Sequence, residues 1–392
     1  MSNIKPKTPP HDDALMANVS EARWKEISAK YPHFPTDLID LSPNRRETFL
    51  RLPRSVEKVL SDYMMDDPRD VIMLSTILNI CCTTVPLHVL NWYYPSHKLG
   101  AFTMALTYFM WAQRFFLVIH YSEHRNVFSH PGMRYFLSCV LCVPFGLPCG
   151  NYHLHHLVMH HVGNNVTDED WSSTEPFQRD EFAQFLQYWA KQFALFLNLS
   201  YYAWKKERYT QFALAGFGTL TWTILGVIGL QKNPIFTLWV QIFPFFMSTF
   251  VLMFGNFSQH ILVHPNVSTD TSNEVGRYRY SSAITFQCIN AMDNLYSFND
   301  GYHVTHHINS RIHWTQHVHH FLTNLEQYVD SGVIVFDGIG PFDVGILTFT
   351  GQLDKLADHM VHFTKDKKPK EELIQELKAR LVPVVRKQEK AL

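Results

Sequence analysis

Histidine is the residue type with the clearest chemical meaning in this sequence, which contains 23 of them. Four clusters stand out: HYSEH at residues 120–124, HLHHLVMHH at 153–161, NFSQH at 256–260 and HVTHH at 303–307. Histidines at positions i and i+4 lie on the same face of a helix, as two ligands of one metal ion must. Neutral imidazole binds iron, zinc, copper or nickel. Cysteine is absent from the clusters, which argues against a structural thiolate zinc site.

Helical spacing selects the predicted ligands within these clusters. At about 100° per residue, His153, His156 and His160 fall within about 60° of one another. His161 lies at the edge of the same face, and His155 points elsewhere, so we do not expect His155 to bind the metal. The predicted ligands are His120, His124, His156, His160, His161, His260, His303, His306 and His307. This number of imidazoles suits two metal ions, each with four or five of them.

Polar residues beside the clusters are predicted to support the ligands. A short acid or amide that accepts the second ring N–H of a ligating histidine fixes the tautomer and the orientation of the ring. The predicted supporting residues, some acting through water, are Glu123, His153, Asn164, Asn165, Asp168, Asn256 and Asp300. The stretch 168–170 fits a solvated charged loop equally well. A surface helix is expected for the histidines that follow the fourth cluster: His313, His317, His319 and His320.

The apolar stretches that flank the clusters have the length of membrane spans. Residues 71–90 are a run of twenty without a charge, which is the length that a bilayer requires. Residues 99–119 follow after a short turn, and residues 212–230 and 235–254 form a second pair that four residues connect. Burial inside a large soluble protein is the alternative, and the tight turns argue against it. The sequence therefore predicts two membrane hairpins.

The distribution of basic residues predicts the orientation of these hairpins. The two turns hold one lysine each, Lys98 and Lys232. The other side collects Arg45, Arg46, Arg51, Arg54, Lys58, Lys205, Lys206 and Arg208. By the positive-inside tendency, both termini and the region between the hairpins face the cytoplasm. In that region, residues 135–150 are predicted to be interfacial or re-entrant, and residues 182–204 to form a helix at the membrane surface.

The predicted fold is an all-α membrane protein with about four transmembrane helices in two hairpins and a cytoplasmic helical cap that carries the metal site. Residues 1–70 are predicted to form a polar N-terminal arm with surface helices, and residues 71–320 the membrane domain. Residues 321–392 are predicted to form a C-terminal cap ending in a charged helix at 371–390. No signal peptide is expected. With 34 Lys+Arg against 35 Asp+Glu, no basic field favours nucleic acid.

The motifs HYSEH, HLVMHH and GYHVTHH resemble, in order and approximate spacing, the three histidine boxes of membrane fatty acid desaturases and related hydroxylases. The resemblance extends over about residues 71–320. NFSQH is similar to an element at the end of the last span in acyl-CoA desaturases, which implies that His260 is a ligand and that Asn256 holds a metal-bound water. The sequence departs from the family pattern at two places. Asp300 stands where the family usually has Glu, and the first box has three residues between its histidines where acyl-CoA desaturases often have four.

This resemblance implies two non-haem Fe²⁺ ions that use O₂ and two electrons to remove hydrogen from an unactivated C–H bond of a fatty acyl or other lipid chain. Desaturation is the predicted outcome, and hydroxylation or alkene-forming decarboxylation stay open. Electrons are expected from a separate protein, either a small haem carrier or a ferredoxin with its reductase. The implied location is the endoplasmic reticulum membrane in a eukaryote, or the inner membrane in a bacterium.

The positions of the histidines argue against two alternatives from other classes of protein. A metal transporter also uses helical HxxxH pairs but needs them in the middle of its spans, and the predicted spans hold only His88. A haem-binding electron-transfer protein needs axial histidines that face each other across paired spans, and the sequence offers no such pair. The clusters instead lie where the spans end, as expected for a metal centre at the membrane face.

Overall fold

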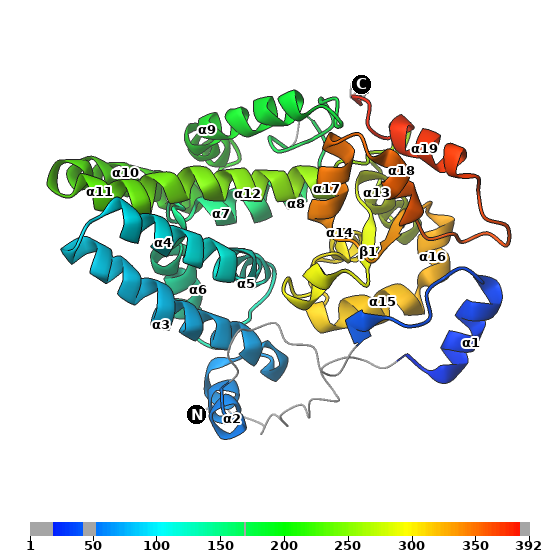
Figure 1. The fold of residues 1–392 in the computed structure, drawn as a ribbon, viewed down its shortest axis with the longest axis horizontal. Coiled ribbons are helices and arrows are strands. Elements are labelled where there is room, and N and C mark those ends of the chain that lie inside the picture. Colours follow the sequence, from blue (N-terminus) through cyan, green and yellow to red (C-terminus); the bar gives the residue numbers. More distant parts are fainter. Residues whose placement is uncertain (1–18, 42–51, 168–169, 385–392) are drawn as a thin grey trace.

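The computed structural model describes residues 19–41, 52–167 and 170–384, apart from the side chains of residues 195–197 (Figure 1). Four helices in this part are long and apolar enough to cross a membrane, which confirms the predicted fold class of a helical protein with four spans. Several predictions fall outside the described residues: those for Asp168, for Arg45, Arg46 and Arg51, and for the two ends of the chain, 1–18 and 385–392.

The four spans form two hairpins, as predicted. In the first, α3 (Val71–Tyr93) precedes a continuous helix built from α4 (His97–Thr107), η4 (Tyr108–Ala112) and α5 (Gln113–His124). In the second, α10 (Tyr209–Lys232) precedes α11 (Pro234–Thr237), η8 (Leu238–Ile242) and α12 (Phe243–Gln259). The spans have 24–28 residues, which exceeds the about 20 that a bilayer requires. Only 11% of the apolar stretch of α10 is buried inside the structure, so this helix lies on the outside of the protein, as expected for a helix that contacts lipid.

Short helices connect the hairpins and shape the centre of the molecule. The segment 131–145 is too short to span a membrane, as predicted, and contains α6 (Pro131–Phe136), η5 (Leu137–Leu141) and η6 (Val143–Phe145). The next helix combines α7 (Asn151–His153), η7 (Leu154–His160) and α8 (His161–Gly163). The predicted helix at 182–204 is α9 (Phe182–Lys205), which packs against α10 and α12. The π-helical turn η7 matters most, because it carries the second histidine cluster.

The cap follows α12 and contains a feature that the sequence did not predict. Its two strands, β1 (Gln287–Ile289) and β2 (Val335–Asp337), pair in parallel with Gln287 opposite Val335. The remaining elements are helical: α13 (Glu274–Ile284), η9 (Met292–Leu295), α14 (His303–Ile308), η10 (Trp314–Gln316), α15 (His317–Thr323), α16 (Leu325–Asp330), α17 (Pro341–Phe349), α18 (Leu353–Asp358) and α19 (Lys370–Ala379). This small sheet fixes the segment that leads to the fourth histidine cluster, since the Cys288 N–H donates to the Gly301 carbonyl.

The C-terminal charged helix is shorter than predicted, because α19 ends at Ala379. The chain then adopts an extended course against the loop that precedes α9. The Arg179 guanidinium donates to the carbonyls of Arg380 and Val382, and the Val384 N–H donates to the Glu175 carbonyl. These backbone contacts take the place of further helical turns.

The described N-terminal residues pack on the cap. Helix α1 (Glu21–Lys30) is followed by the turn η2 (Ile39–Leu41). Ile27 of α1 is buried in one cluster with cap residues, as are Tyr31 and Phe34 of the segment between these two elements. The Arg23 guanidinium donates to the Leu322 carbonyl. Helix α2 (Arg54–Met64) and the turn η3 (Pro68–Asp70) then lead into α3. Residues 19–41 of the arm are thus packed on the cap, whereas α2 lies against α3.

Candidate metal centre

The first two histidine clusters and the fourth meet at the end of the second span. His120 and His124 lie one turn apart on α5, and each of them contacts a histidine from another element. The Nε2 atoms of His120 and His306 are 3.1 Å apart, and those of His124 and His156 are 3.0 Å apart. One ligand atom from each of these four residues lies within 4.8 Å of all the others. They therefore form a compact set of imidazoles contributed by α5, η7 and α14.

His161 joins this set because η7 is a π-helical turn. A π turn closes hydrogen bonds from i to i+5, so residues five apart become neighbours on one face. The Nε2 atom of His161 lies 3.1 Å from that of His156 and 3.2 Å from that of His306. The α-helical spacing assumed from the sequence had placed His161 at the edge of the face. We call His120, His124, His156, His161 and His306 the five-histidine group.

The same π turn separates His153 from the predicted face. Its Nδ1 atom lies 2.6 Å from Glu123 Oε2, and Arg134 lies 3.0 Å from the same carboxylate oxygen. Glu123 thus pairs with His153 and Arg134, and neither of these two residues belongs to the five-histidine group. The sequence spacing did not indicate this arrangement, because it assumed a regular α-helix.

A second group of histidines lies beside the first. Ligand atoms of His160, His260 and His307 lie within 4.8 Å of one another, and the Nε2 atom of His303 is 3.2 Å from that of His307. We call these the four-histidine group. The rings of His161 and His307 stack with their centroids 5.3 Å apart, so the two groups adjoin. The structure thus brings all nine predicted ligands into two neighbouring sets.

Contacts at Nδ1 orient the rings of His160, His260 and His307 in the four-histidine group. In each of these rings, Nδ1 points away from the other histidines of the group. Three acceptors lie within hydrogen-bond distance of these nitrogens: Asp170 Oδ2 at 2.6 Å from His160, the Ile284 carbonyl at 2.9 Å from His260, and Asn164 Oδ1 at 2.9 Å from His307. A ring that donates through Nδ1 presents Nε2 as a bare acceptor. The buried Nε2 of His260 has no hydrogen-bond partner among the described residues. That atom is therefore free to bind a metal ion.

Asp170 is the supporting residue that the sequence did not single out. The side chain is fully buried, and the Ser172 hydroxyl and the Asn165 N–H also donate to its carboxylate. Burial opposes ionisation of this carboxyl, but its interactions with His160 and the Ser172 hydroxyl lower its pKa well below the usual range. Asp170 lies ten residues after His160, in the stretch 168–170 that fits a solvated loop equally well. Helical spacing therefore did not predict that Asp170 would contact His160.

Two other predicted supporting residues, Asp300 and Asn256, lie near the four-histidine group. Asp300 Oδ1 is 3.7 Å from His303 Nδ1, and the Gln259 amide donates to Asp300 Oδ2. The Asn256 side-chain amide donates to the Tyr188 hydroxyl at 2.7 Å and to the Ser172 carbonyl at 3.3 Å. The amide of Asn256 is thus held in place at the end of α12.

The prediction of a surface helix after the fourth cluster was wrong for His313 and His317. Both are buried, and His317 is completely inaccessible. The His317 ring lies beside Tyr121 and His306, with centroids 6.1 and 6.4 Å away. Its Nε2 has no hydrogen-bond partner among the described residues. Helix α15 packs inward beneath α14 and α5, a tertiary contact that local histidine spacing does not encode.

The spacing of the imidazole nitrogens fits bound metal ions. Metal–nitrogen bonds of about 2.1 Å at right angles place neighbouring ligand nitrogens about 3 Å apart, and the Nε2 contacts above are 3.0–3.2 Å. Burial, followed by repulsion from neighbouring histidines, lowers the pKa of His156, His161 and His306 well below its ordinary value. These rings are therefore neutral at pH 7, as metal ligation requires.

A cavity of about 540 Å³ extends from the two groups along α5 and α12. Its volume lies within the range of about 300–1,000 Å³ that is typical of ligand pockets. Histidines from both groups line it: His120, His156, His160 and His303. The walls toward the spans are apolar and include Phe116, Leu117, Val251 and Leu252. The imidazoles thus face a space suited to an apolar ligand.

Four membrane-spanning helices and nine clustered histidines beside an apolar cavity define an integral membrane protein with a candidate metal centre. Residues 96–337, more than half of the chain, match the family described as Fatty acid desaturase, and the chain belongs to this family. Neither a curated protein nor a solved structure matches it. Family membership indicates an oxidoreductase of the desaturase and hydroxylase type, with a lipid substrate and O₂, in a membrane.

Proposed function

We propose that this protein is an O₂-dependent fatty acid desaturase with a non-haem di-iron centre. The observation that carries the proposal is the convergence of nine histidines from α5, η7, α8, the end of α12 and α14, four of which line an apolar cavity. A haem site would need one or two axial histidines, and a structural zinc site would enclose its metal without an adjoining cavity. The family match supports the lipid substrate.

In this proposal the five-histidine group holds one iron and the four-histidine group holds the other. Bound iron supplies the activation of O₂ that cleavage of an unactivated C–H bond requires. The protein contributes the fixed orientation of its rings. Asp170, Ile284 and Asn164 accept the Nδ1 protons of His160, His260 and His307, which aims each Nε2 at the metal. Asn256 would position a metal-bound water, as the family resemblance implies.

The cavity would hold the acyl chain beside the histidines. Apolar side chains of α5 and α12, such as Phe116 and Val251, would bind the methylene groups and exclude water. Exclusion of water protects the oxidising centre from side reactions. The position of the chain relative to His120 and His156 would then decide which carbon atoms lose hydrogen.

The surroundings of the enzyme follow from the same proposal. The cap and both termini would face the cytoplasm, because the basic residues gather on that side of the spans. A separate haem carrier, or a ferredoxin with its reductase, would deliver electrons to the cap. The membrane would be the endoplasmic reticulum in a eukaryote and the inner membrane in a bacterium.

Feeding of deuterated fatty acids to a host that expresses the protein tests the reaction. Mass spectrometry of the host lipids should reveal a chain that has lost two hydrogens, with a located double bond. His124→Ala and His306→Ala should abolish the product, because each removes a ligand of the five-histidine group. An added oxygen would identify a hydroxylase instead, and a terminal alkene shortened by one carbon would identify a decarboxylase.

A further inference from the structure

The large cavity lies between the two hairpins, in the half of the spans that is nearer the cap. Its lining follows α5 and α12, one span from each hairpin. Along the second span the lining begins at Tyr108 in η4 and ends at His120. The Tyr108 hydroxyl donates to the Pro244 carbonyl at 2.7 Å and lies 2.6 Å from the Ser248 hydroxyl. The two hairpins are thus joined at the level of Tyr108 and enclose the cavity from there toward the cap.

Beyond Tyr108, toward the hairpin turns, the hairpins approach each other closely. A Cβ atom at Gly100 of α4 would lie 2.3 Å from Cγ of Trp239 in η8, so this approach requires glycine. The Trp239 indole donates to His97 Nδ1 at 3.0 Å, and the Asn233 amide donates to the Trp92 carbonyl at 2.9 Å. These contacts hold the hairpins together in the half of the spans that is farther from the cap.

Two side chains mark where the cavity reaches the surface of the protein. Phe109 and Met247 both line the cavity, yet they are 92% and 41% exposed. Phe109 is the thirteenth of the 28 residues of its span, and Met247 is the fourteenth of the 26 residues of its span. The middle of a membrane span is surrounded by hydrocarbon rather than by water. The cavity therefore has a lateral opening to the bilayer core, between the two hairpins at Phe109 and Met247.

The depth of the cavity corresponds to one leaflet of a bilayer. Eleven residues separate Phe109 from His120, which is about 16 Å along a helix that rises about 1.5 Å per residue. Half of the hydrocarbon core of a bilayer is about 15 Å thick. A lipid in the leaflet on the cap side has the methyl end of its acyl chain near the middle of the bilayer and its polar end at the surface. Such a chain covers the same depth as the cavity.

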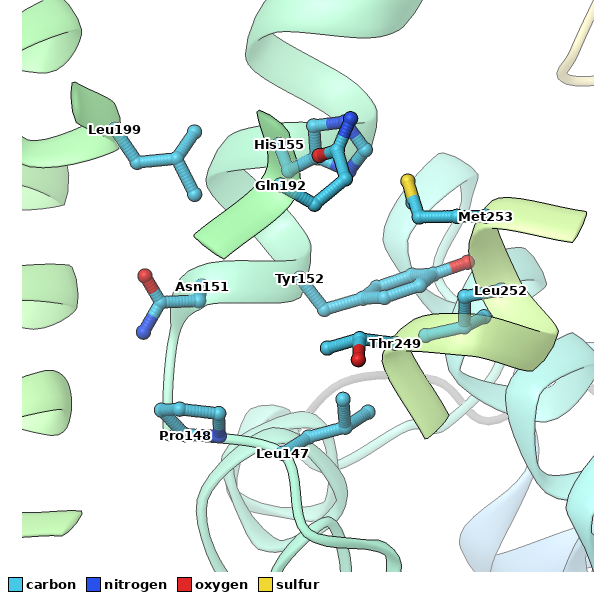
Figure 2. A pocket seen from close by; sticks show the side chains of 10 residues that line it. All are labelled: Leu147, Pro148, Asn151, Tyr152, His155, Gln192, Leu199, Thr249, Leu252 and Met253. Atoms are coloured by element: carbon cyan, nitrogen blue, oxygen red, sulfur yellow. The ribbon is translucent and has the colours of Figure 1, made fainter. Parts of the chain in front are cut away.

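The wall of the cavity on the side of α7 is formed by side chains that also line a second cavity of only about 50 Å³. Figure 2 shows the Tyr152 ring of this wall reaching from its helix toward Leu252 and Met253 of α12. The same ring stacks on the ligand candidate His156, with centroids 5.3 Å apart. A chain that lies against this wall is therefore next to the histidines.

The end of the cavity at the cap does not suit a soluble acyl carrier. Asp293, Asp300 and Asp343 line it, and the described lining residues include no lysine or arginine. Coenzyme A carries several phosphate charges, and like charges brought together oppose binding. The charges at this end therefore favour a chain that stays in the bilayer over a chain that such a carrier presents.

We propose that the substrate is the acyl chain of a lipid that stays in the membrane, and that this chain enters the cavity sideways from the bilayer core through the lateral opening. The inference rests on the proposed function for the reaction at the histidines. It specifies the substrate class and the route of entry, which the metal centre alone does not define.

Photoreactive acyl chains test the proposal. Purified protein in phosphatidylcholine vesicles receives either a phosphatidylcholine or a coenzyme A thioester, each with the same acyl chain that bears a photoreactive group in its middle. Phe116 lines the cavity and is only 4% exposed, so lipid outside the protein does not reach it. We expect the phosphatidylcholine to label α5 near Phe116 and the thioester to label it about tenfold less, because charge repulsion at the cap opposes entry of the thioester. Mass spectrometry of peptides locates the label.

The double variant Phe109→Trp/Met247→Trp should reduce labelling by the phosphatidylcholine about tenfold, since larger rings narrow the lateral opening and raise the barrier to entry. Phe102→Trp/Leu225→Trp is the matched control, with one exposed apolar position in each hairpin outside the cavity lining. This control should be labelled as strongly as the wild type.

Equal or stronger labelling near Phe116 by the thioester would overturn the inference, and desaturation of that thioester would leave the desaturase proposal intact. Equal labelling of the two double variants would also overturn the inference, because the chain would then enter by another route. Labelling by the phosphatidylcholine, without desaturation of any chain once iron and an electron donor are supplied, would support the inference and overturn the proposed reaction.

Discussion

At the scale of single residues, the histidines of the candidate metal centre are oriented by side chains that lie behind them. The His160 ring is held by Asp170, itself buried and held by Ser172 and the Asn165 N–H. A carboxylate in this position fixes the tautomer of the ring and increases the basicity of the nitrogen that binds metal. The metal affinity of the four-histidine group is therefore expected to depend on Asp170, which lies ten residues after His160 in the sequence.

Asp170→Asn is expected to lower iron affinity by about 10- to 100-fold, because the amide no longer supplies the negative charge that orients His160. Iron per protein, measured after dialysis against a weak chelator, checks this. Asp354→Asn, at an exposed position on α18, is the control and should retain the wild-type iron content. Equal iron content in both variants would contradict the role of Asp170.

The buried His317 makes stability depend on pH. Burial lowers the pKa of this ring from 6.5 to about 4 in the folded protein. Below pH 6.5 the unfolded chain takes up a proton that the folded protein does not bind. The contribution of His317 to stability is therefore complete above pH 6.5 and is lost as the pH falls toward 4, by about 3 kcal/mol at most.

Thermal unfolding of the metal-free protein in detergent measures this effect. Between about pH 7 and about pH 5, the His317→Phe variant should lose less stability than the wild type. His130→Phe, at an exposed position, should lose as much as the wild type. The same pH dependence in wild type and His317→Phe would show that this ring titrates normally.

At the scale of elements, the π turn η7 decides which histidines meet. Hydrophobic length was enough to predict the four spans, and the four histidine clusters were enough to select the nine histidines that converge. The sequence did not reveal the extra residue in the turn of η7, since a π turn has no local composition that separates it from an α-helix. The partners of His153 and the burial of His317 were missed for a related reason, because both depend on tertiary packing.

His161→Ala and His153→Ala test this element directly. His161→Ala should lose at least one iron per protein, because His161 Nε2 faces His156 and His306. His153→Ala should keep both irons, because His153 pairs with Glu123 outside the two groups. Metal analysis of the two purified variants makes the comparison. Loss of iron from His153→Ala alone would indicate that the segment is a regular α-helix.

At the scale of the whole molecule, the two hairpins place the histidine groups at the ends of the second and fourth candidate spans. The histidines of α5 and α12 lie at the ends of their spans, and the cap closes over them with α14. Hydrogen bonds and ion pairs connect the cap to the spans. Asp70, at the start of α3, accepts from the Trp314 indole and pairs with Arg125. The cap and the membrane part are therefore packed as one unit around the histidines.

Labelling of single cysteines tests the proposed orientation. In a chain whose native cysteines are replaced, Lys232→Cys at the second hairpin turn should react with an impermeant reagent only from the outer or lumenal side. Lys367→Cys on the cap should react only from the cytoplasmic side. Reaction of both positions from the same side would rule out a hairpin that crosses the membrane.

The position of Arg179 also has a consequence for the order in which the molecule is built. Its guanidinium donates to the carbonyl of Ile261, next to the ligand candidate His260, and to the carbonyls of Arg380 and Val382. A ribosome makes His260 long before it makes Arg380. The loop that carries His260 therefore gains its last hydrogen bonds only after nearly the whole chain has been synthesised. Until then, the loop at His260 lacks these contacts, so we expect the candidate metal site to be complete only once the whole chain has folded.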